Sequence, residues 1–177
     1  QQIGDFTKSA IDFDRSIEIN PDDADAITQR GNLAAEQGNF DEAVTDFRQA
    51  ITKDPNWAEA YRSLAWLEAT CPNPSFQNPQ EAITAAERAA KLWPATDYLI
   101  LDTLAAAHAS AGRFDKASEL QRQAVSCAPT EMSGQLKQRF ELYRMGHAFR
   151  NVPNGGDNHE VPGGSPSEAN LPVGALR

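Results

Sequence analysis

Few residues in this chain combine the types and spacing that enzyme or metal chemistry requires. Asp157, His159 and Glu160 carry metal-binding atoms close together, but they fall in a Gly- and Pro-rich stretch with no elements to orient them. His147 lies at a predicted helix end, where a cation favours the negative pole of the helix dipole. The chain contains no phosphate-binding loop, nucleophile elbow or His-Glu metal motif. We therefore predict no catalytic residue, no metal and no cofactor, and the protein is not expected to be an enzyme.

A tandem repeat organises most of the chain. Pro21 and Pro55 are 34 residues apart, and four more pairs share this offset: Gly4 and Gly38, Phe6 and Phe40, Phe13 and Phe47, Ser16 and Ala50. The pattern continues through Ala43, Ala82 and Ala117, through Ala50, Ala89 and Ala124, and through Pro55, Pro94 and Pro129. A fixed period of this length is typical of solenoid proteins, in which each unit is one supersecondary element.

These residues resemble the tetratricopeptide repeat (TPR) family, whose unit of about 34 residues is a helix, a turn and a second helix. The unit at residues 24–57 matches best: Gly31 is the small residue where the two helices cross, and Pro55 closes the unit. Three positions depart from the family pattern, with Ile27, Arg30 and Ala34 where Trp, Leu and Tyr are usual. The segment from Leu67 to Pro72 resembles a bacterial TPR subtype.

The resemblance implies an all-α fold, a right-handed superhelical solenoid of antiparallel helix pairs. Gly38 and Gly112 each permit a left-handed helix stop, and an aspartate in the first turn of the next helix favours its positive pole. Pro after each second helix ends it. Helices are predicted over residues 5–19, 24–37, 40–53, 57–70, 79–92, 97–111, 114–127 and 131–146.

The expected organisation is a TPR array over residues 1–147 followed by a Pro/Gly-rich tail over 148–177. Within the array we expect a half repeat at 1–23, repeats at 24–57, 58–96 and 97–130, and a capping helix at 131–147. The third unit carries an insert with three prolines between Cys71 and Pro79, which predicts a rigid extended loop. Because the chain opens without Met, it reads as an internal fragment whose preceding helix lies upstream.

The remaining reactive side chains have structural interpretations within such an array. His108 falls on a helix face that TPR units normally pack, so a core or half-buried role is favoured over catalysis. Cys71 ends a first helix and Cys127 a second helix, and these ends lie on opposite edges of the array, about 20 Å apart. A disulfide requires Cα atoms closer than about 7 Å. Both cysteines are therefore predicted to be free, semi-buried thiols.

In TPR arrays the first helix of each unit lines the concave groove, which is where we expect a partner to bind. Matching the repeats assigns this groove to Asp25, Thr28, Asn32, Glu36, Glu59, Arg62, Trp66, Thr70, Leu99 and Asp102. Trp66 and Arg62 resemble an interface hot spot, since both residue types are enriched there; the alternative is that Trp66 simply packs on its neighbour. The carboxylate clamp of chaperone-binding TPR proteins is rejected, because Thr28, Leu99 and Thr103 replace its basic residues.

Charge and composition limit the partners. Sixteen basic against 25 acidic residues give a net charge of −9, which argues against a nucleic-acid footprint and against an anionic membrane surface. No apolar run approaches the ~18 residues that a membrane span requires, so membrane insertion is not expected. The expected partner is therefore a protein or a peptide. Localisation stays open between the cytoplasm and export.

Two hypotheses about function follow. The first is a non-catalytic interaction module, part of a larger protein, that binds a peptide or protein in its groove. The second is a structural spacer or oligomerisation element, with the C-terminal tail packing on its own or a neighbouring array. Self-association is expected through the N-terminal end, whose helix carries the apolar residues Phe6, Ile11, Phe13 and Ile17. The apolar tail residues Leu171, Val173 and Leu176 are predicted to lie on the array.

Overall fold

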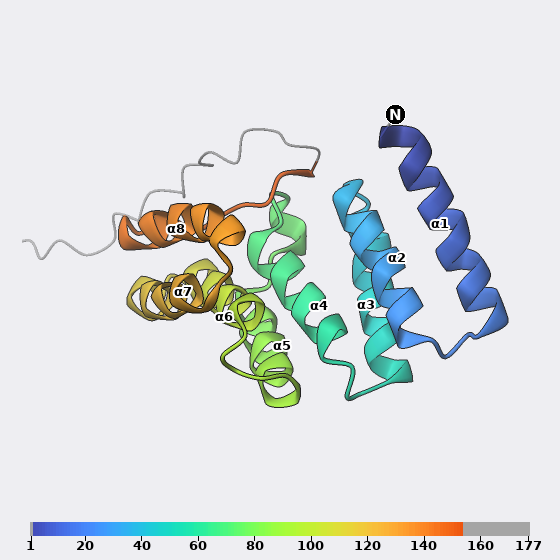
Figure 1. The fold of residues 1–177 in the computed structure, drawn as a ribbon, viewed down its shortest axis with the longest axis horizontal. Helices are drawn as coiled ribbons and strands as arrows, with labels where there is room; N and C mark the ends of the chain where they lie inside the picture. The colour runs from blue at the N-terminus through green and yellow to red at the C-terminus, as the bar shows by residue number, and fades with distance from the viewer. Residues whose placement is uncertain (1, 154–177) are drawn as a thin grey trace, which may run out of the picture.

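The computed structural model describes the backbone of residues 2–153 and the side chains from residue 10 onward. Residues 2–153 contain helices and turns and no β-strand (Figure 1). The helices are α1 (Gln2–Ile19), α2 (Ala24–Glu36), α3 (Phe40–Lys53), α4 (Ala58–Thr70), η1 (Pro74–Phe76), α5 (Pro79–Leu92), α6 (Tyr98–Ser110), α7 (Phe114–Cys127) and α8 (Thr130–Arg144). Each α-helix begins and ends within three residues of its predicted bounds.

The helices stack side by side in chain order into a solenoid of helix pairs (Figure 1). The closest packing joins the two helices of each pair, α2 with α3, α4 with α5 and α6 with α7. First helices also contact the first helices of neighbouring units, since α4 packs on both α2 and α6. The array therefore has one side made of first helices, which are α2, α4, α6 and, at the C-terminal end, α8.

Gly31 allows α2 and α3 to approach each other closely. A Cβ atom added to Gly31 would lie 2.7 Å from Cε1 of Phe47 and 3.0 Å from Cβ of Asp46. Phe47 is only 1% exposed, so its ring is held within the core. The predicted role of Gly31 at the helix crossing is confirmed.

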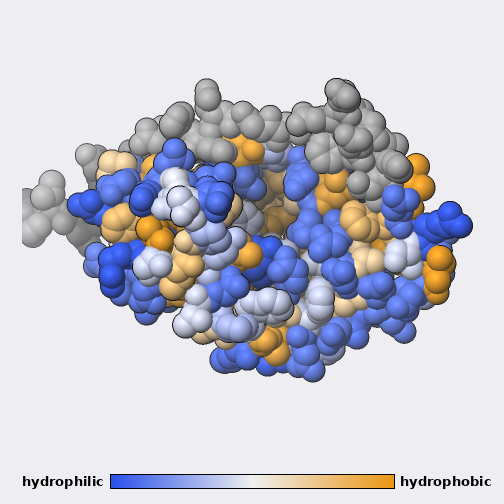
Figure 2. All heavy atoms as spheres, viewed as in Figure 1, coloured by the Kyte–Doolittle hydropathy of each residue, from blue (hydrophilic) through white to orange (hydrophobic). Residues whose placement is uncertain are grey.

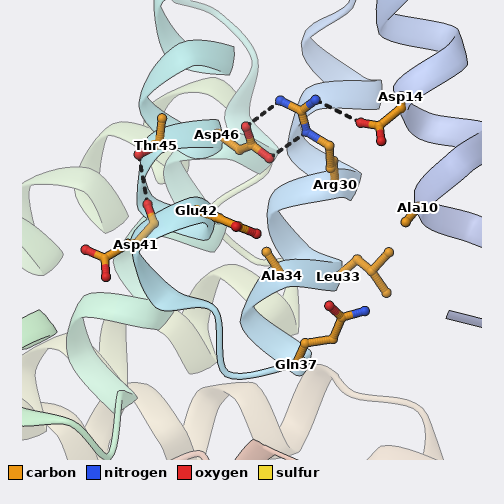
Figure 3. A pocket seen from close by; sticks show the side chains of 10 residues that line it. All are labelled: Ala10, Asp14, Arg30, Leu33, Ala34, Gln37, Asp41, Glu42, Thr45 and Asp46. Carbon is orange, nitrogen blue, oxygen red and sulfur yellow. Dashed lines mark hydrogen bonds and ion pairs between the residues drawn. The ribbon is translucent and has the colours of Figure 1, made fainter. Parts of the chain in front are cut away.

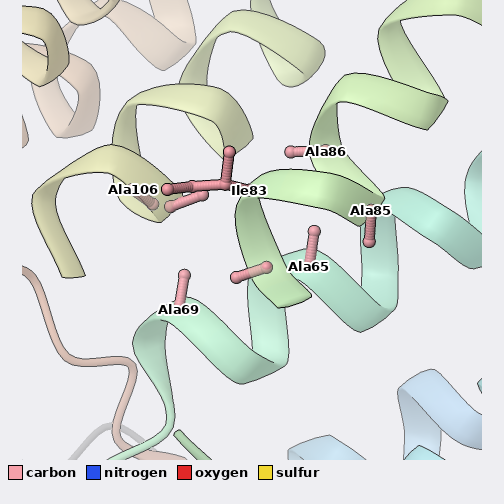
Figure 4. Close-up of a cluster of buried hydrophobic side chains, with 8 residues drawn as sticks. Ala65, Ala69, Ile83, Ala85, Ala86 and Ala106 are labelled. Atoms are coloured by element: carbon pink, nitrogen blue, oxygen red, sulfur yellow. The ribbon is translucent and has the colours of Figure 1, made fainter. Parts of the chain in front are cut away.

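Small side chains form the core between units. One cluster packs α4, α5 and α6 together almost entirely through alanine, as Figure 4 shows for Ala65, Ala69, Ala85, Ala86 and Ala106 around Ile83. The sequence pattern predicts burial of Ala43, Phe47, Ala50, Leu64, Ala82, Leu104, Ala117 and Ala124, and all except Leu104 are buried. Leu104 is half-buried because it packs at the boundary between two clusters.

The helix–turn–helix joints have the predicted geometry. Gly38 and Gly112 both adopt positive φ, and in each joint the residue after the glycine donates its backbone N–H to a carbonyl of the last helical turn. Gly146 ends α8 in the same way, with φ +78°. After Gly146, however, no second helix follows, and residues 147–152 have no regular secondary structure.

The insert of the third unit is more folded than an extended loop. Pro74–Phe76 forms a turn of 3₁₀-helix, and Phe76 packs its ring against Phe40 with centroids 5.5 Å apart. The prediction of an extended loop is wrong here, because the ring contact and the Asn73 side chain stabilise a turn. Asn78 caps α5 as expected by accepting the Glu81 backbone N–H.

The two cysteines are free, as predicted. Their exposure differs from the expectation that both are semi-buried. Cys71 is buried at the end of α4, whereas Cys127 is exposed at the end of α7. Burial raises the pKa of the Cys71 thiol, which disfavours its reactive thiolate form.

Arg30, which stands where the family usually has Leu, links three helices. Its guanidinium forms a two-pronged ion pair with Asp46 of α3 (2.9 and 2.7 Å) and a further one with Asp14 of α1 (3.0 Å), as Figure 3 shows. A cavity of about 460 Å³ lies beside this bridge, between α1 and the first helix pair. The structure therefore accommodates a charged residue at this usually apolar position, because Arg30 forms ion pairs with both neighbouring helices.

Two large apolar side chains of α1 are exposed to solvent. Ile11 is 61% exposed and Ile19 78% exposed, while Phe13 and Ile17 are half-buried. Phe6 belongs to the part of α1 whose side chains are not described. Self-association through this surface remains a prediction.

Glu68 is buried on α4 among charged groups from two other helices. Arg48 of α3 lies 3.5 Å from one carboxylate oxygen, and Glu81 of α5 also faces it. Burial and the negative charge of Glu81 raise the pKa of Glu68 to about 8, against the opposing influence of Arg48. Glu68 therefore keeps its proton in the folded chain at a pH where it is ionised in the unfolded chain.

The Gly31 crossing predicts the sign of two matched substitutions. G31A should lower the free energy of unfolding by about 1–3 kcal/mol, because the new methyl group overpacks a rigid crossing. G134A, in α8, should raise it by roughly 0.5–1 kcal/mol, because a Cβ there meets no atom within 4 Å and alanine favours the helix. Chemical denaturation measures both values. Equal effects of the two substitutions would refute the proposed crossing constraint.

The raised pKa of Glu68 predicts a stability loss with rising pH. Below pH 4.5 the carboxyl is protonated in both states; between about pH 4.5 and 8 only the unfolded state releases the proton, so folding weakens. E68Q should therefore gain stability over the unsubstituted chain as pH rises, by about 1–3 kcal/mol at pH 8. Melting curves from pH 5 to 8 test this, with E42Q at an exposed position as control. If the difference in stability between E68Q and the unsubstituted chain does not change with pH, the raised pKa of Glu68 is contradicted.

Candidate partner-binding groove

His108 has the buried position that the sequence favours. It is buried at the end of α6, and its Nδ1 atom has no hydrogen-bond partner. Burial, together with the positive charges of Arg113 and Lys116, lowers its pKa. Residues 2–153 contain no group of three side chains suited to a metal ion and no helix long and apolar enough to cross a membrane. Asp157, His159 and Glu160 lie outside the described residues.

The main hollow of the molecule lies on the side formed by the first helices. It encloses about 1140 Å³ between α4, α6, α8 and the chain that follows α8. A smaller hollow of about 80 Å³ adjoins it toward α2, and Arg62, Trp66 and Asn151 line both. We call the two together the groove. Elsewhere, on the face shown in Figure 2, hydrophilic residues predominate and hydrophobic ones lie in small separate groups.

The floor of the larger hollow is apolar. Its apolar lining consists of Trp66, Leu99, Met132, Leu142, Met145 and Phe149. Met145 is 62% exposed and Leu99 37% exposed, so these apolar side chains are accessible to a ligand. Gln135 and Gln138 add amide groups that can donate and accept hydrogen bonds. The hollow can therefore take apolar and hydrogen-bonding side chains.

The predicted groove residues divide into three groups. Asn32, Arg62, Trp66, Thr70, Leu99 and Asp102 line the groove. Asp25, Glu36 and Glu59 lie on the first helices but line neither hollow, and Glu59 acts by pairing with Arg62. Thr28 does not reach the surface, because it is fully buried and its hydroxyl donates to the Ala24 carbonyl.

Both arginines of the groove, Arg62 and Arg139, are paired with carboxylates, and Lys137 and Glu141 also line its larger hollow. Arg62 Nε donates to Glu59 at 2.9 Å, and a second, shorter bond completes a two-pronged pair. Burial alone would lower the pKa of Arg62, but the Glu59 carboxylate more than offsets it, so the pKa is raised and Arg62 stays charged. With its charge already paired, Arg62 offers little to a free carboxylate.

A buried polar network joins α8 to the array. Arg139 of α8 forms a two-pronged ion pair with Asp102 of α6, at 2.8 and 2.7 Å. Gln121 of α7 donates to the same carboxylate at 2.7 Å and to the Leu136 carbonyl at 3.2 Å. All three polar side chains are buried. Because one carboxylate accepts from two other helices, the network fixes α8 relative to both α6 and α7.

Arg139 also orders the aromatic centre of the groove. Its guanidinium carbon lies 5.4 Å from the ring centre of Trp66 and 5.3 Å from that of Phe149. The two rings themselves lie 5.9 Å apart with a tilted geometry. These distances suit cation–π and aromatic contacts. Trp66 is half-buried: it packs beside Phe149 and also lines the groove, and its role as an interface hot spot stays a prediction.

The six residues from Ala148 to Pro153, which we call the return segment, cross the end of α4. The Asn151 backbone N–H donates to the Thr70 carbonyl at 2.8 Å, and the Arg150 guanidinium donates to the Ala69 carbonyl at 3.2 Å. These carbonyls belong to the last turn of α4, where a helix leaves its acceptors unpaired. The segment then reaches Pro153, beside the turn at Gly38.

The sequence analysis missed the contribution of α8 and the return segment. It predicted a capping helix at residues 131–147 and placed none of its residues in the groove. Leu136 and Tyr143 are buried, but Leu142 and Met145 line the groove. A signal was present: phenylalanine follows Gly38 and Gly112 by two residues but Gly146 by three, which marks a different continuation of the chain.

The fold and the groove define an α-solenoid that presents a concave surface. A tetratricopeptide repeat family model matches residues 24–56, and a second one matches residues 99–128. The chain is a tetratricopeptide repeat protein. Repeats of this family indicate a protein–protein interaction module.

Solved structures agree on the fold. A crystal structure of MamA protein superposes with a TM-score of 0.61 at 22% identity, covering 82% of this chain and 75% of that one. A second crystal structure of MamA gives a TM-score of 0.58 at 19% identity, covering 82% and 90%. At this identity the likeness concerns the fold alone. No curated protein sequence matches the chain.

Proposed function

We propose that this array binds an extended or helical peptide of a partner protein in the groove and has no catalytic role of its own. The observation that carries the proposal is the half-buried Trp66 at the point where the two hollows meet. A large aromatic side chain in a partly desolvated hollow, with an arginine one turn away, has the composition of an interface hot spot.

The lining of the groove indicates the chemistry of the ligand. Its two arginines are already paired with Glu59 and Asp102, and its floor is apolar. A ligand that presents apolar side chains gains from burial there, whereas a free C-terminal carboxylate finds no unpaired arginine. We therefore favour recognition through side chains along a peptide over the capture of a chain end.

The alternative function, a spacer or oligomerisation element, is supported by one observation. The return segment, which is the beginning of the predicted tail, packs on α4 of its own array. The predicted docking of Leu171, Val173 and Leu176 concerns residues outside the described part of the chain and stays a prediction. The same holds for self-association through α1 and for membership of a larger protein.

Peptide display on the intact chain tests the groove proposal. We expect enriched peptides rich in apolar and aromatic residues, and W66A should weaken their binding by at least roughly tenfold, the cost of removing a hot-spot residue. T84A is the matched control, because Thr84 is exposed on α5, a second helix, and lines neither hollow of the groove.

Circular dichroism must show that both variants keep their helical content. Equal binding to W66A and T84A would place the ligand elsewhere and contradict the proposal. If no peptide is enriched, the spacer or oligomerisation alternative gains support.

A further inference from the structure

The return segment lies in the groove as a peptide ligand would. Residues 148–152 have no regular secondary structure, and their hydrogen bonds to α4 are of the kind that an extended peptide makes. One backbone N–H and one guanidinium bind the carbonyls at the end of α4, and one aromatic ring packs on Trp66 beneath Arg139.

We propose that the groove recognises extended peptides in which an aromatic residue precedes a basic one, and that the return segment is a resident copy of this ligand which a partner must displace. The inference rests on the proposed function and names the ligand class and the competitor. Phe149 and Arg150 are the aromatic and basic residues of the resident copy.

Each contact of the resident segment can be supplied by another peptide. The ring of Phe149 packs beside Trp66 and under the Arg139 guanidinium, and these contacts are open to any aromatic side chain. The Thr70 carbonyl accepts a backbone N–H, which any residue except proline provides. The Ala69 carbonyl lies at the negative pole of α4, which favours any cationic side chain.

The packing of the segment is compatible with release. None of its residues is buried: Ala148, Phe149 and Arg150 are half-buried, and Asn151 is exposed. The buried Asp102–Arg139 pair that holds α8 lies beneath the segment and does not depend on it for hydrogen bonds. Removing the segment therefore uncovers the aromatic site while the ion pair keeps α8 in place.

A partner peptide can gain contacts that the resident segment does not make. The segment fills only the end of the groove near Trp66, and the larger hollow remains open over Leu99, Met132, Leu142 and Met145. A ligand with the same aromatic and basic residues and additional apolar residues would cover that floor. Those additional contacts are what would allow it to compete with a tethered segment, which has the advantage of a high local concentration.

The test is peptide binding in trans to the full chain. A synthetic peptide of residues 147–153 is titrated to ~0.1 mM, about tenfold below the ~1 mM effective concentration of a tethered segment, while the amide and indole N–H resonances are followed by NMR. In F149A the peptide should shift the resonances of Trp66 and of the residues around Thr70. In the unsubstituted chain and in F140A these resonances should not shift. Phe140 is the matched control, because its ring lies on α8 outside the groove and packs with Arg144.

A peptide with Ala in place of its Phe should give no response on F149A. No response of F149A to the natural peptide, or equal responses of F149A and the unsubstituted chain, would overturn the proposal. If F149A loses its helical signal, N151P replaces it, because it removes the N–H bonded to Thr70 and leaves Phe149 in place. The two proposals can fail separately. If displayed peptides bind the chain and W66A weakens that binding, but the 147–153 peptide does not bind F149A, this inference is refuted and the proposed function stands.

Discussion

The buried ion pair between Asp102 and Arg139 is the interaction on which the groove depends. Burying two charges is costly and is offset only where geometry and further hydrogen bonds are good. Both conditions are met here, since the guanidinium binds both carboxylate oxygens and Gln121 donates to the same carboxylate. Losing one partner would leave the other charge buried and unpaired. The pair therefore holds α8 against α6 in one orientation.

That orientation determines the form of the binding surface. With α8 held in place, its residues Leu142 and Met145 line the hollow opposite Trp66. The same Arg139 guanidinium that pairs with Asp102 covers the rings of Trp66 and Phe149, so one side chain joins the core network to the surface. The helix at the end of the array thus does more than shield the last repeat from water; it forms one wall of the groove.

The fold could be predicted from the sequence because its determinants are local and repeated. Gly38, Gly112 and Pro55 mark helix ends by backbone geometry alone, and Gly31 marks a crossing by the absence of a side chain. The groove was only partly predictable: Trp66 and Arg62 follow from their register in a first helix. The pairing of Asp102 with Arg139 joins residues 37 apart through tertiary packing, and the path after Gly146 depends on carbonyls at the end of α4, so neither appears in a local pattern.

Hydrogen exchange of R139M compared with the unsubstituted chain tests most directly whether this ion pair holds the groove together. The account predicts that amides of α8 and the Asn151 amide exchange at least roughly tenfold faster in R139M, because an unpaired buried charge at Asp102 weakens the docking of α8 by several kcal/mol. Amides of α2 and α3, which lie outside the network, should keep their protection. Unchanged protection of α8 and Asn151 in a folded R139M chain would contradict the account.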